Sequence, residues 1–204
     1  MNHIKPSTIR IAVIIALLAV SAISPAQEKG EMPDMTPEMQ AEMEAWMKIA
    51  QPGAHHEHLA PFVGTWKGKV TMWMGPDQAP MVEEAVADVT WLLGGRFLQW
   101  KQTGNFGDMP FEGMAIEGYN NGDGRYESVW LDSFGTILVF FTGSCSDDGE
   151  HRNMATKFAD VVAGGTVDYR TEYQWIDSDH FTYSAFMNKG DGEFRNLRIE
   201  YERQ

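Results

Sequence analysis

From Leu59 to the C-terminus, apolar and polar residues alternate in short segments that turn-forming residues interrupt at intervals of about 8–15 residues. In one segment Val167, Tyr169, Tyr173 and Trp175 alternate with charged or polar residues. A period of two places successive side chains on opposite faces, so each segment predicts a strand with one apolar face. The interruptions are rich in Asn, Asp and Gly, which accept the positive φ angles of tight hairpins. The pattern predicts an antiparallel β-meander.

Nine or ten segments fit this description. Their approximate spans are 62–74, 81–92, 96–103, 110–119, 125–132, 135–143, 151–159, 166–176, 180–187 and 193–202. The links between them are short and contain no crossover helix, and a sheet with so many strands removes its exposed edges by closing. We therefore expect an all-β antiparallel barrel of about eight to ten strands, wide enough to hold one small ligand or to be filled by its own side chains.

The N-terminus predicts an export signal over residues 1–26. A basic segment precedes an apolar run at 11–20, and Ser24 and Ala26 stand at the −3 and −1 positions of a cleavage site. Cleavage after Ala22 is the alternative site. The apolar run is short for a transmembrane helix, and an uncleaved anchor is the alternative to cleavage.

Residues 27–57 predict a linker followed by an amphipathic helix, and residues 58–204 the barrel domain. Thr36 can cap the N-terminus of this helix, and Pro37 suits its first position. Pro52 and Gly53 follow its last turn and end it. One apolar stripe recurs at helical spacing and consists of Met39, Met43, Trp46, Met47 and Ala50.

The charge and the cysteine usage limit the partners and the compartment. The formal net charge is −13, and it becomes −15 when a signal that carries two cations and no carboxylates is removed. Such a chain repels phosphate backbones and anionic lipid surfaces, so we expect no nucleic-acid partner and no stable membrane association after cleavage. Cys145 is the only cysteine, which excludes an intramolecular disulfide. We expect a periplasmic or secreted bacterial protein.

A set of short motifs occurs in a fixed order along the barrel segment. It comprises His58-Leu59, Gly64-Thr65-Trp66, Leu93-Gly94-Gly95-Arg96-Phe97, Phe111-Glu112-Gly113, Gly118-Tyr119, Tyr126, Trp130 with Asp132-Ser133, and a terminal Arg198-Ile199-Glu200-Tyr201-Glu202-Arg203. The Gly-x-Trp motif resembles the first strand of lipocalin and fatty-acid-binding barrels. The whole set resembles the bacterial family known as domain of unknown function 1579, over nearly all of the mature chain.

The resemblance implies a calycin-like, or lipocalin-like, β-barrel with a short N-terminal amphipathic helix. It supplies no established substrate, cofactor or catalytic residue. In lipocalins a basic residue of the last strand covers the first-strand Trp and seals that end. By this resemblance Arg198 or Arg203 covers Trp66, in a cation–π contact worth up to about 2 kcal/mol when desolvated.

The aromatic content favours a partly open interior. The chain has seven Trp, eleven Phe and six Tyr residues, which is more than a collapsed barrel needs. Arg96, Arg170 or Arg195 would then be available to meet a ligand carboxylate. The candidates for ligand binding or barrel closure are Trp66, Arg96, Trp130 and Arg198.

Metal binding is the weaker of two interpretations of the His and Met residues. His56 and His58 lie two positions apart and could meet at one ion, but a third ligand would have to come from elsewhere. A second candidate is a set of thioethers that suit Cu(I), which belong to Met32, Met35, Met39, Met43 and Met47. Trp46 and Ala50 continue the same stripe without offering ligands. We expect packing for the stripe and no metal or other cofactor.

Enzyme chemistry has little support, since the sequence contains no Gly-x-Ser-x-Gly elbow, phosphate loop or His-Glu-x-x-His motif. The leading hypothesis is a non-enzymatic barrel that binds a small apolar or amphipathic molecule in its interior. The alternatives are a cavity enzyme of cyclase or isomerase type and a metal- or copper-handling accessory protein. The cavity enzyme would need a buried carboxylate, for which Glu84, Glu117 and Asp132 are the candidates.

Overall fold

The computed structural model describes residues 35–160, 163–190 and 192–204. The predicted signal peptide and the first part of the predicted linker lie outside the described residues. The chain divides into two units, Met1–Glu42 and Met43–Gln204.

Helix α2 (Pro37–Ile49) begins in the first unit and ends in the second. The Met39 amide donates a hydrogen bond to Thr36 Oγ1 at 3.3 Å, so Thr36 caps the helix as its sequence position predicts. No residue of α2 is buried. None of the described helices is both long and apolar enough to cross a membrane.

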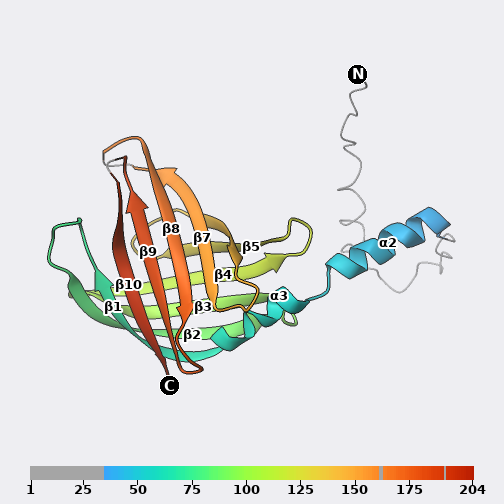
Figure 1. Ribbon diagram of the computed structural model, residues 1–204, viewed down its shortest axis with the longest axis horizontal. Coiled ribbons are helices and arrows are strands. Elements are labelled where there is room, and N and C mark those ends of the chain that lie inside the picture. The colour runs from blue at the N-terminus through green and yellow to red at the C-terminus, as the bar shows by residue number, and fades with distance from the viewer. Residues whose placement is uncertain (1–34, 161–162, 191) are drawn as a thin grey trace, which may run out of the picture. The chain divides into compact units, whose positions relative to one another are not determined.

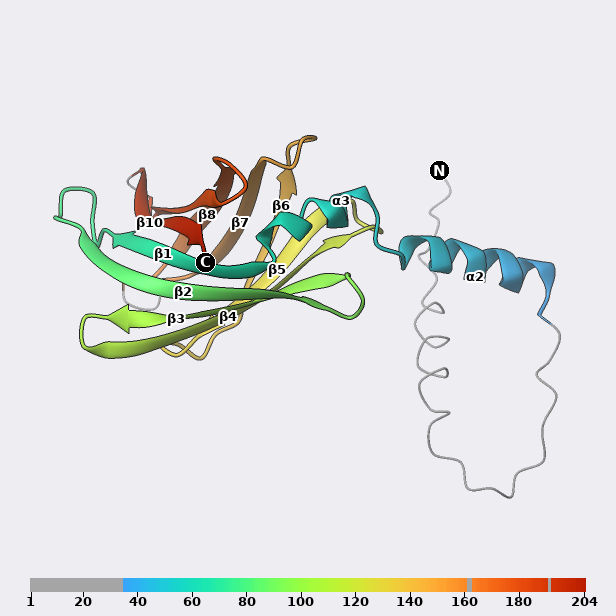
Figure 2. The same cartoon turned by 90° about the horizontal axis from the view of Figure 1, so that it is seen from below.

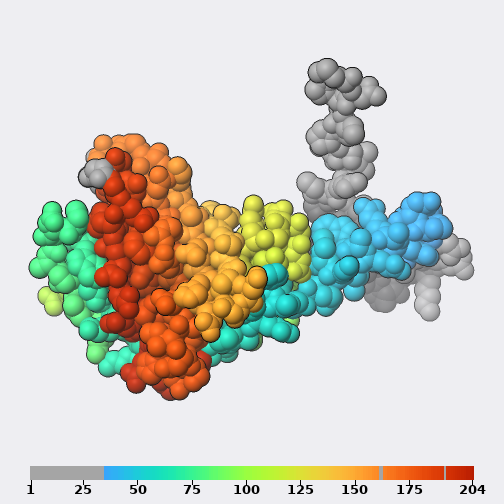
Figure 3. All heavy atoms as spheres, in the orientation of Figure 1, coloured from blue at the N-terminus to red at the C-terminus, as the bar shows by residue number. Residues whose placement is uncertain are grey.

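The second unit is a closed antiparallel barrel of ten strands (Figure 1). The strands are β1 Gly64–Met72, β2 Met81–Leu92, β3 Phe97–Phe106, β4 Met109–Asn120, β5 Arg125–Asp132, β6 Val139–Cys145, β7 His151–Ala159, β8 Thr166–Trp175, β9 His180–Asn188 and β10 Glu193–Arg203. Each strand pairs with its neighbour in sequence, and β1 also pairs with β10, which leaves no free edge. In Figure 3 the C-terminal strands, orange to red, form the near wall. The predicted all-β barrel is confirmed.

Two predicted strand starts differ from the structure by more than one residue. The first strand begins at Gly64 rather than at residue 62, because Ala60–Phe62 forms a 3₁₀ turn that directs Phe62 into the barrel. The sixth strand begins at Val139 rather than at residue 135, since residues 133–138 form a loop before it.

A short helix, α3 (Ala54–Glu57), precedes the barrel. It begins where the Gly53 amide donates to His56 Nδ1 at 3.1 Å. Figure 2 shows α3 next to β5, and there the Tyr126 hydroxyl donates to the His55 carbonyl at 3.0 Å. These bonds hold the chain across one end of the barrel before β1 begins.

That end of the barrel is filled by four aromatic side chains, here called the aromatic plug: Phe62, Trp66, Trp175 and Phe181. The ring centroids of Phe62 and Trp175 and those of Trp66 and Phe181 are both 4.7 Å apart. The Trp66 indole donates to the Phe62 carbonyl at 2.7 Å, so its one polar atom is satisfied in the core. Each such ring stabilises the fold by roughly 1.5–3 kcal/mol through burial.

Candidate functional site

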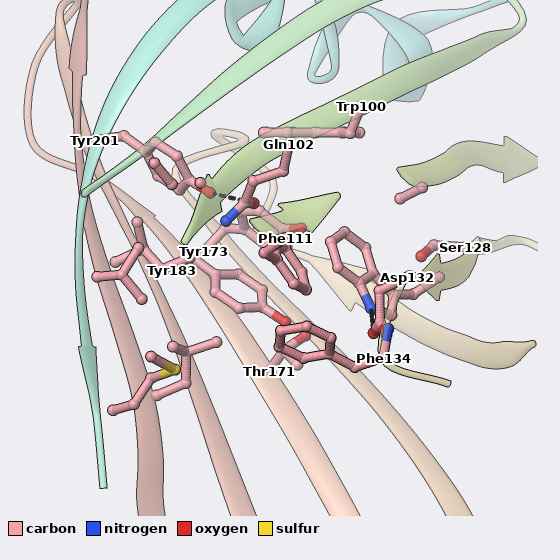
Figure 4. Close-up of a pocket in the computed structure, with 18 of the residues that line it drawn as sticks. Trp100, Gln102, Phe111, Ser128, Asp132, Phe134, Thr171, Tyr173, Tyr183 and Tyr201 are labelled. Atoms are coloured by element: carbon pink, nitrogen blue, oxygen red, sulfur yellow. Dashed lines mark hydrogen bonds between the residues drawn. The ribbon is translucent and has the colours of Figure 1, made fainter. Parts of the chain in front are cut away.

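Beyond the aromatic plug the barrel interior opens into a cavity of about 340 Å³ (Figure 4). Trp100, Glu117 and Tyr173 line the end nearest the plug, here called the floor. Phe111 and Phe134 line the opposite end, here called the mouth. The interior is therefore sealed at one end by rings and left hollow over the rest of its length.

Aromatic rings surround the mouth. The Phe111 ring stacks against Trp130 with centroids 6.4 Å apart and contacts Phe134 at 5.3 Å. The Trp130 indole donates to Asp132 Oδ2 at 2.8 Å, which fixes its orientation. Gly113 makes room for this ring, because a Cβ at that position would lie 2.4 Å from Trp130. Trp130, predicted as a ligand-binding residue, thus lies in the cavity wall.

Hydroxyl groups from the C-terminal strands line the facing wall. They belong to Tyr169, Thr171, Tyr173, Tyr183 and Tyr201. The Tyr201 hydroxyl donates to Gln102 Oε1 at 2.9 Å across the interior (Figure 4). Burial raises the pKa of Tyr173, Tyr183 and Tyr201, so their hydroxyls are neutral donors and acceptors.

A buried ion pair lies at the floor. Arg152 Nη2 is 2.8 Å from Glu117 Oε1, and each side chain is only 2 % exposed. The contact is close but is not aligned as a hydrogen bond. Burial raises the pKa of the Glu117 carboxyl, whereas the Arg152 guanidinium and the Trp100 indole act in the opposite direction. The guanidinium also lies over the Tyr173 ring, 4.3 Å from its centroid.

Arg203 is the basic residue that covers Trp66. Its guanidinium carbon lies 4.0 Å from the Trp66 ring centroid, and its nitrogens donate to the carbonyls of Val63 at 2.9 Å and Pro61 at 2.8 Å. Gly64 permits this approach, because its φ is 138° and a Cβ there would lie 2.7 Å from Arg203 Nη1. The Gly-x-Trp motif and the terminal arginine are therefore parts of one closure.

Arg198 does not take this role, which corrects its assignment as a closing residue. It alternates with Ile199 and so lies on the outer face of β10, where its Nε is 3.6 Å from Glu200 Oε1. A shift of one residue along a strand moves a side chain to the other face, and the motif by itself did not fix which arginine faced inward.

The arginines expected to meet a ligand carboxylate lie elsewhere. Arg96 donates to the carbonyls of Ala50 and Leu93, each at 3.1 Å, and is not part of the cavity wall. Arg170 pairs with carboxylates of β8 and β10. Arg195 lies over the Trp73 ring at 5.0 Å. The residues that line the cavity include no lysine or arginine.

The two candidate metal-binding histidines each have a partner within the protein. His56 is buried and accepts the Gly53 hydrogen bond, and burial lowers its pKa. His58 Nδ1 lies 3.2 Å from the Tyr126 hydroxyl. Within residues 35–160, 163–190 and 192–204, no three His, Cys, Asp or Glu side chains are grouped to hold a metal ion.

The three candidate carboxylates have different surroundings. Glu84 also borders the cavity, but its side chain is 73 % exposed and pairs with Lys67 at 2.9 Å. Asp132 lines the cavity near the mouth and accepts the Trp130 hydrogen bond. Glu117 is both buried and part of the cavity wall.

Arg152 is the important residue that the sequence analysis missed. The sequence did contain a signal. Arg152 lies two positions before Met154, and Glu117 lies two positions after Ala115, so each charged side chain is on the same face of its strand as an apolar residue. A charged residue on the apolar face of a predicted strand requires a partner inside the barrel. The sequence pattern does not show which charges from different strands meet.

A closed antiparallel barrel with a sealed end and a hollow interior is a calycin-like barrel. The chain belongs to the family described as protein of unknown function (DUF1579), whose model matches residues 51–203. A solved structure described as the crystal structure of Rv2717c from M. tuberculosis is similar in fold, with a TM-score of 0.56 and 19 % sequence identity. The match covers 76 % of this chain and 99 % of that chain. No curated protein matches the sequence.

Proposed function

We propose that the protein is a non-enzymatic binding barrel that holds a small apolar or amphipathic molecule in its cavity. The observation that carries this proposal is the hollow of about 340 Å³, sealed at one end and ringed by aromatic side chains at the other. Ligand pockets commonly fall in the range of roughly 300–1,000 Å³ and combine an apolar wall with a few polar groups.

The wall chemistry supports a ligand with an apolar body and a small polar group. Rings such as Phe111 and Trp130 provide broad apolar contacts. The tyrosine and threonine hydroxyls on the facing wall offer hydrogen bonds without carrying charge.

The test combines native mass spectrometry with a binding assay. Protein purified gently from an exporting host is examined for a reproducible organic adduct, and N-phenyl-1-naphthylamine, a neutral apolar dye, is titrated by fluorescence. Ala115→Phe fills the cavity and is expected to weaken dye binding by at least about tenfold, since the added ring occupies the ligand's space. Ile116→Phe, on the outer face of the same strand, is the matched control. No adduct and no dye binding in the wild type would overturn the proposal.

A cavity enzyme of cyclase or isomerase type is the second candidate function. The observation that favours it is the position of Glu117, which is buried and lines the cavity. A buried carboxyl whose pKa is raised is a usual proton donor or acceptor. The bound molecule, once identified, is incubated with the protein and then analysed by chromatography. A product of equal mass and changed retention time, lost in Glu117→Gln, would favour the enzyme. Recovery of unchanged ligand would exclude turnover of that molecule.

We also propose that the chain is exported and that its signal is removed. The charged, apolar and small-residue segments of residues 1–26 support this proposal. The intact mass of the protein from the periplasm or medium is expected to match a chain that begins at Gln27. A full-length mass in the cytoplasm would contradict it.

A further inference from the structure

The charges around the cavity are unevenly distributed. Glu84, Glu117 and Asp132 are the acidic residues among those that line it, and none of the described residues of the lining is a lysine or arginine. Arg152 is the buried cation closest to the floor, since it contacts both Glu117 and Tyr173. In the part of the chain that the structure describes, Arg152 is the arginine that contacts the floor, and its guanidinium has the charge to attract an anionic ligand.

Arg152 is built into a site shaped for an anion. Its guanidinium carbon lies 4.3 Å from the Tyr173 ring centroid, 4.7 Å from that of Phe62 and 5.7 Å from that of Tyr126. These rings exclude water and hold the guanidinium in place, and a planar guanidinium suits carboxylates. The carboxylate that occupies this position belongs to the protein, because Glu117 approaches from β4, which two strands separate from β7 around the barrel.

We propose that Glu117 is a specificity-determining residue, an internal carboxylate that neutralises Arg152 and so restricts the cavity to uncharged ligands. The preferred class is a neutral amphiphile that carries a hydroxyl or carbonyl group, and a carboxylate of the same length is excluded. This inference rests on the proposed binding function. A ligand carboxylate would have to leave water, would meet no free cation among the described residues of the wall, and would lie near the acidic side chains of Glu117 and Asp132.

The test compares two ligands that differ only in their polar group, 1-decanol and decanoate. Each displaces N-phenyl-1-naphthylamine from the wild-type protein at pH 7.5. We expect decanol to bind at least about tenfold more tightly than decanoate, because one unpaired buried charge readily accounts for such a ratio. In Glu117→Gln the guanidinium loses its carboxylate, and we expect decanoate affinity to rise by at least about tenfold while decanol affinity changes little. Glu112→Gln removes a charge from the outer face of the same strand and is the matched control.

A second variant keeps the test decisive if a lone buried guanidinium prevents folding. Glu117→Gln combined with Arg152→Met removes both charges, and it is expected to retain decanol binding and to gain no affinity for decanoate.

Equal binding of the two ligands by the wild type would overturn the inference and leave the proposed function standing. A folded Glu117→Gln protein that gains no affinity for decanoate would also overturn the inference and leave the proposed function standing. Failure of decanol, decanoate and the dye to bind would overturn the proposed function, and the inference with it.

Discussion

The closure of the barrel by Arg203 makes a quantitative prediction. Arg203→Met removes a guanidinium that stacks on Trp66 at 4.0 Å and donates three hydrogen bonds, to the carbonyls of Pro61, Val63 and Ser178 at 2.8, 2.9 and 3.3 Å. Such a cation–π contact is worth about 0.5–2 kcal/mol, and hydrogen bonds of a charged group about 1.5–3 kcal/mol each. These contributions are not additive, and the side chain is 29 % exposed, which weakens them. We expect the free energy of unfolding to fall by about 2–4 kcal/mol.

The assay is urea unfolding followed by tryptophan fluorescence, together with thermal unfolding, in which Tm should fall by roughly 5–15 °C. Arg203→Lys keeps the charge but not the planar fork, so an intermediate loss is expected. Arg198→Met on the outer face is the control, and its expected loss is about 0.5 kcal/mol or less. Equal losses in Arg203→Met and Arg198→Met would refute the assignment of the closure to Arg203.

Three further predictions concern the plug, the mouth and pH. Phe62→Ala should reduce the free energy of unfolding by about 3–5 kcal/mol, because Phe62 is 2 % exposed within the plug. The measurement is urea unfolding, and a loss below about 1 kcal/mol would contradict the prediction by showing that neighbouring side chains fill the space. Gly113→Ala places a Cβ 2.4 Å from Trp130, so it should lower the free energy of unfolding by about 1–3 kcal/mol and weaken dye binding. Unchanged stability and unchanged dye affinity would contradict this packing. Burial lowers the pKa of His56 from 6.5, so the folded state binds a proton less readily than the unfolded state, and stability should fall as pH decreases below that value. His56→Asn keeps an acceptor for Gly53 but does not titrate, so its unfolding free energy should fall less between about pH 7.5 and 5.5; identical pH profiles would exclude His56 as the cause.

The strand pattern was predictable because it depends on local chemistry. The segments at 81–92, 125–132 and 151–159 coincide with β2, β5 and β7, where alternation and turn residues agree. The start of β6 was placed too early, because Ile137 and Leu138 are apolar residues of a loop and are more than half exposed. An apolar residue signals burial on average, and only its neighbours in space decide the individual case.

The candidate site was predictable in kind but not in detail. The aromatic content indicated a cavity, and Trp130 does line it. Of the arginines named from the sequence, Arg96 and Arg198 do not line the cavity, whereas Arg203 does cover Trp66. Arg152 on β7 meets Glu117 on β4 across two intervening strands, and no local pattern encodes the meeting of side chains so far apart in sequence.

The sequence by itself determined the all-β class and a closed barrel of about eight to ten strands, because periodicity and turn chemistry are local properties of the chain, and its Gly-x-Trp motif indicated a seal by resemblance. Only the tertiary structure decided that Arg203 seals the barrel, that the interior is hollow beyond the plug, and that Glu117 neutralises Arg152. The physical reason is that closure brings together side chains from strands remote in sequence, and both the remaining volume and the pairing of charges depend on that packing.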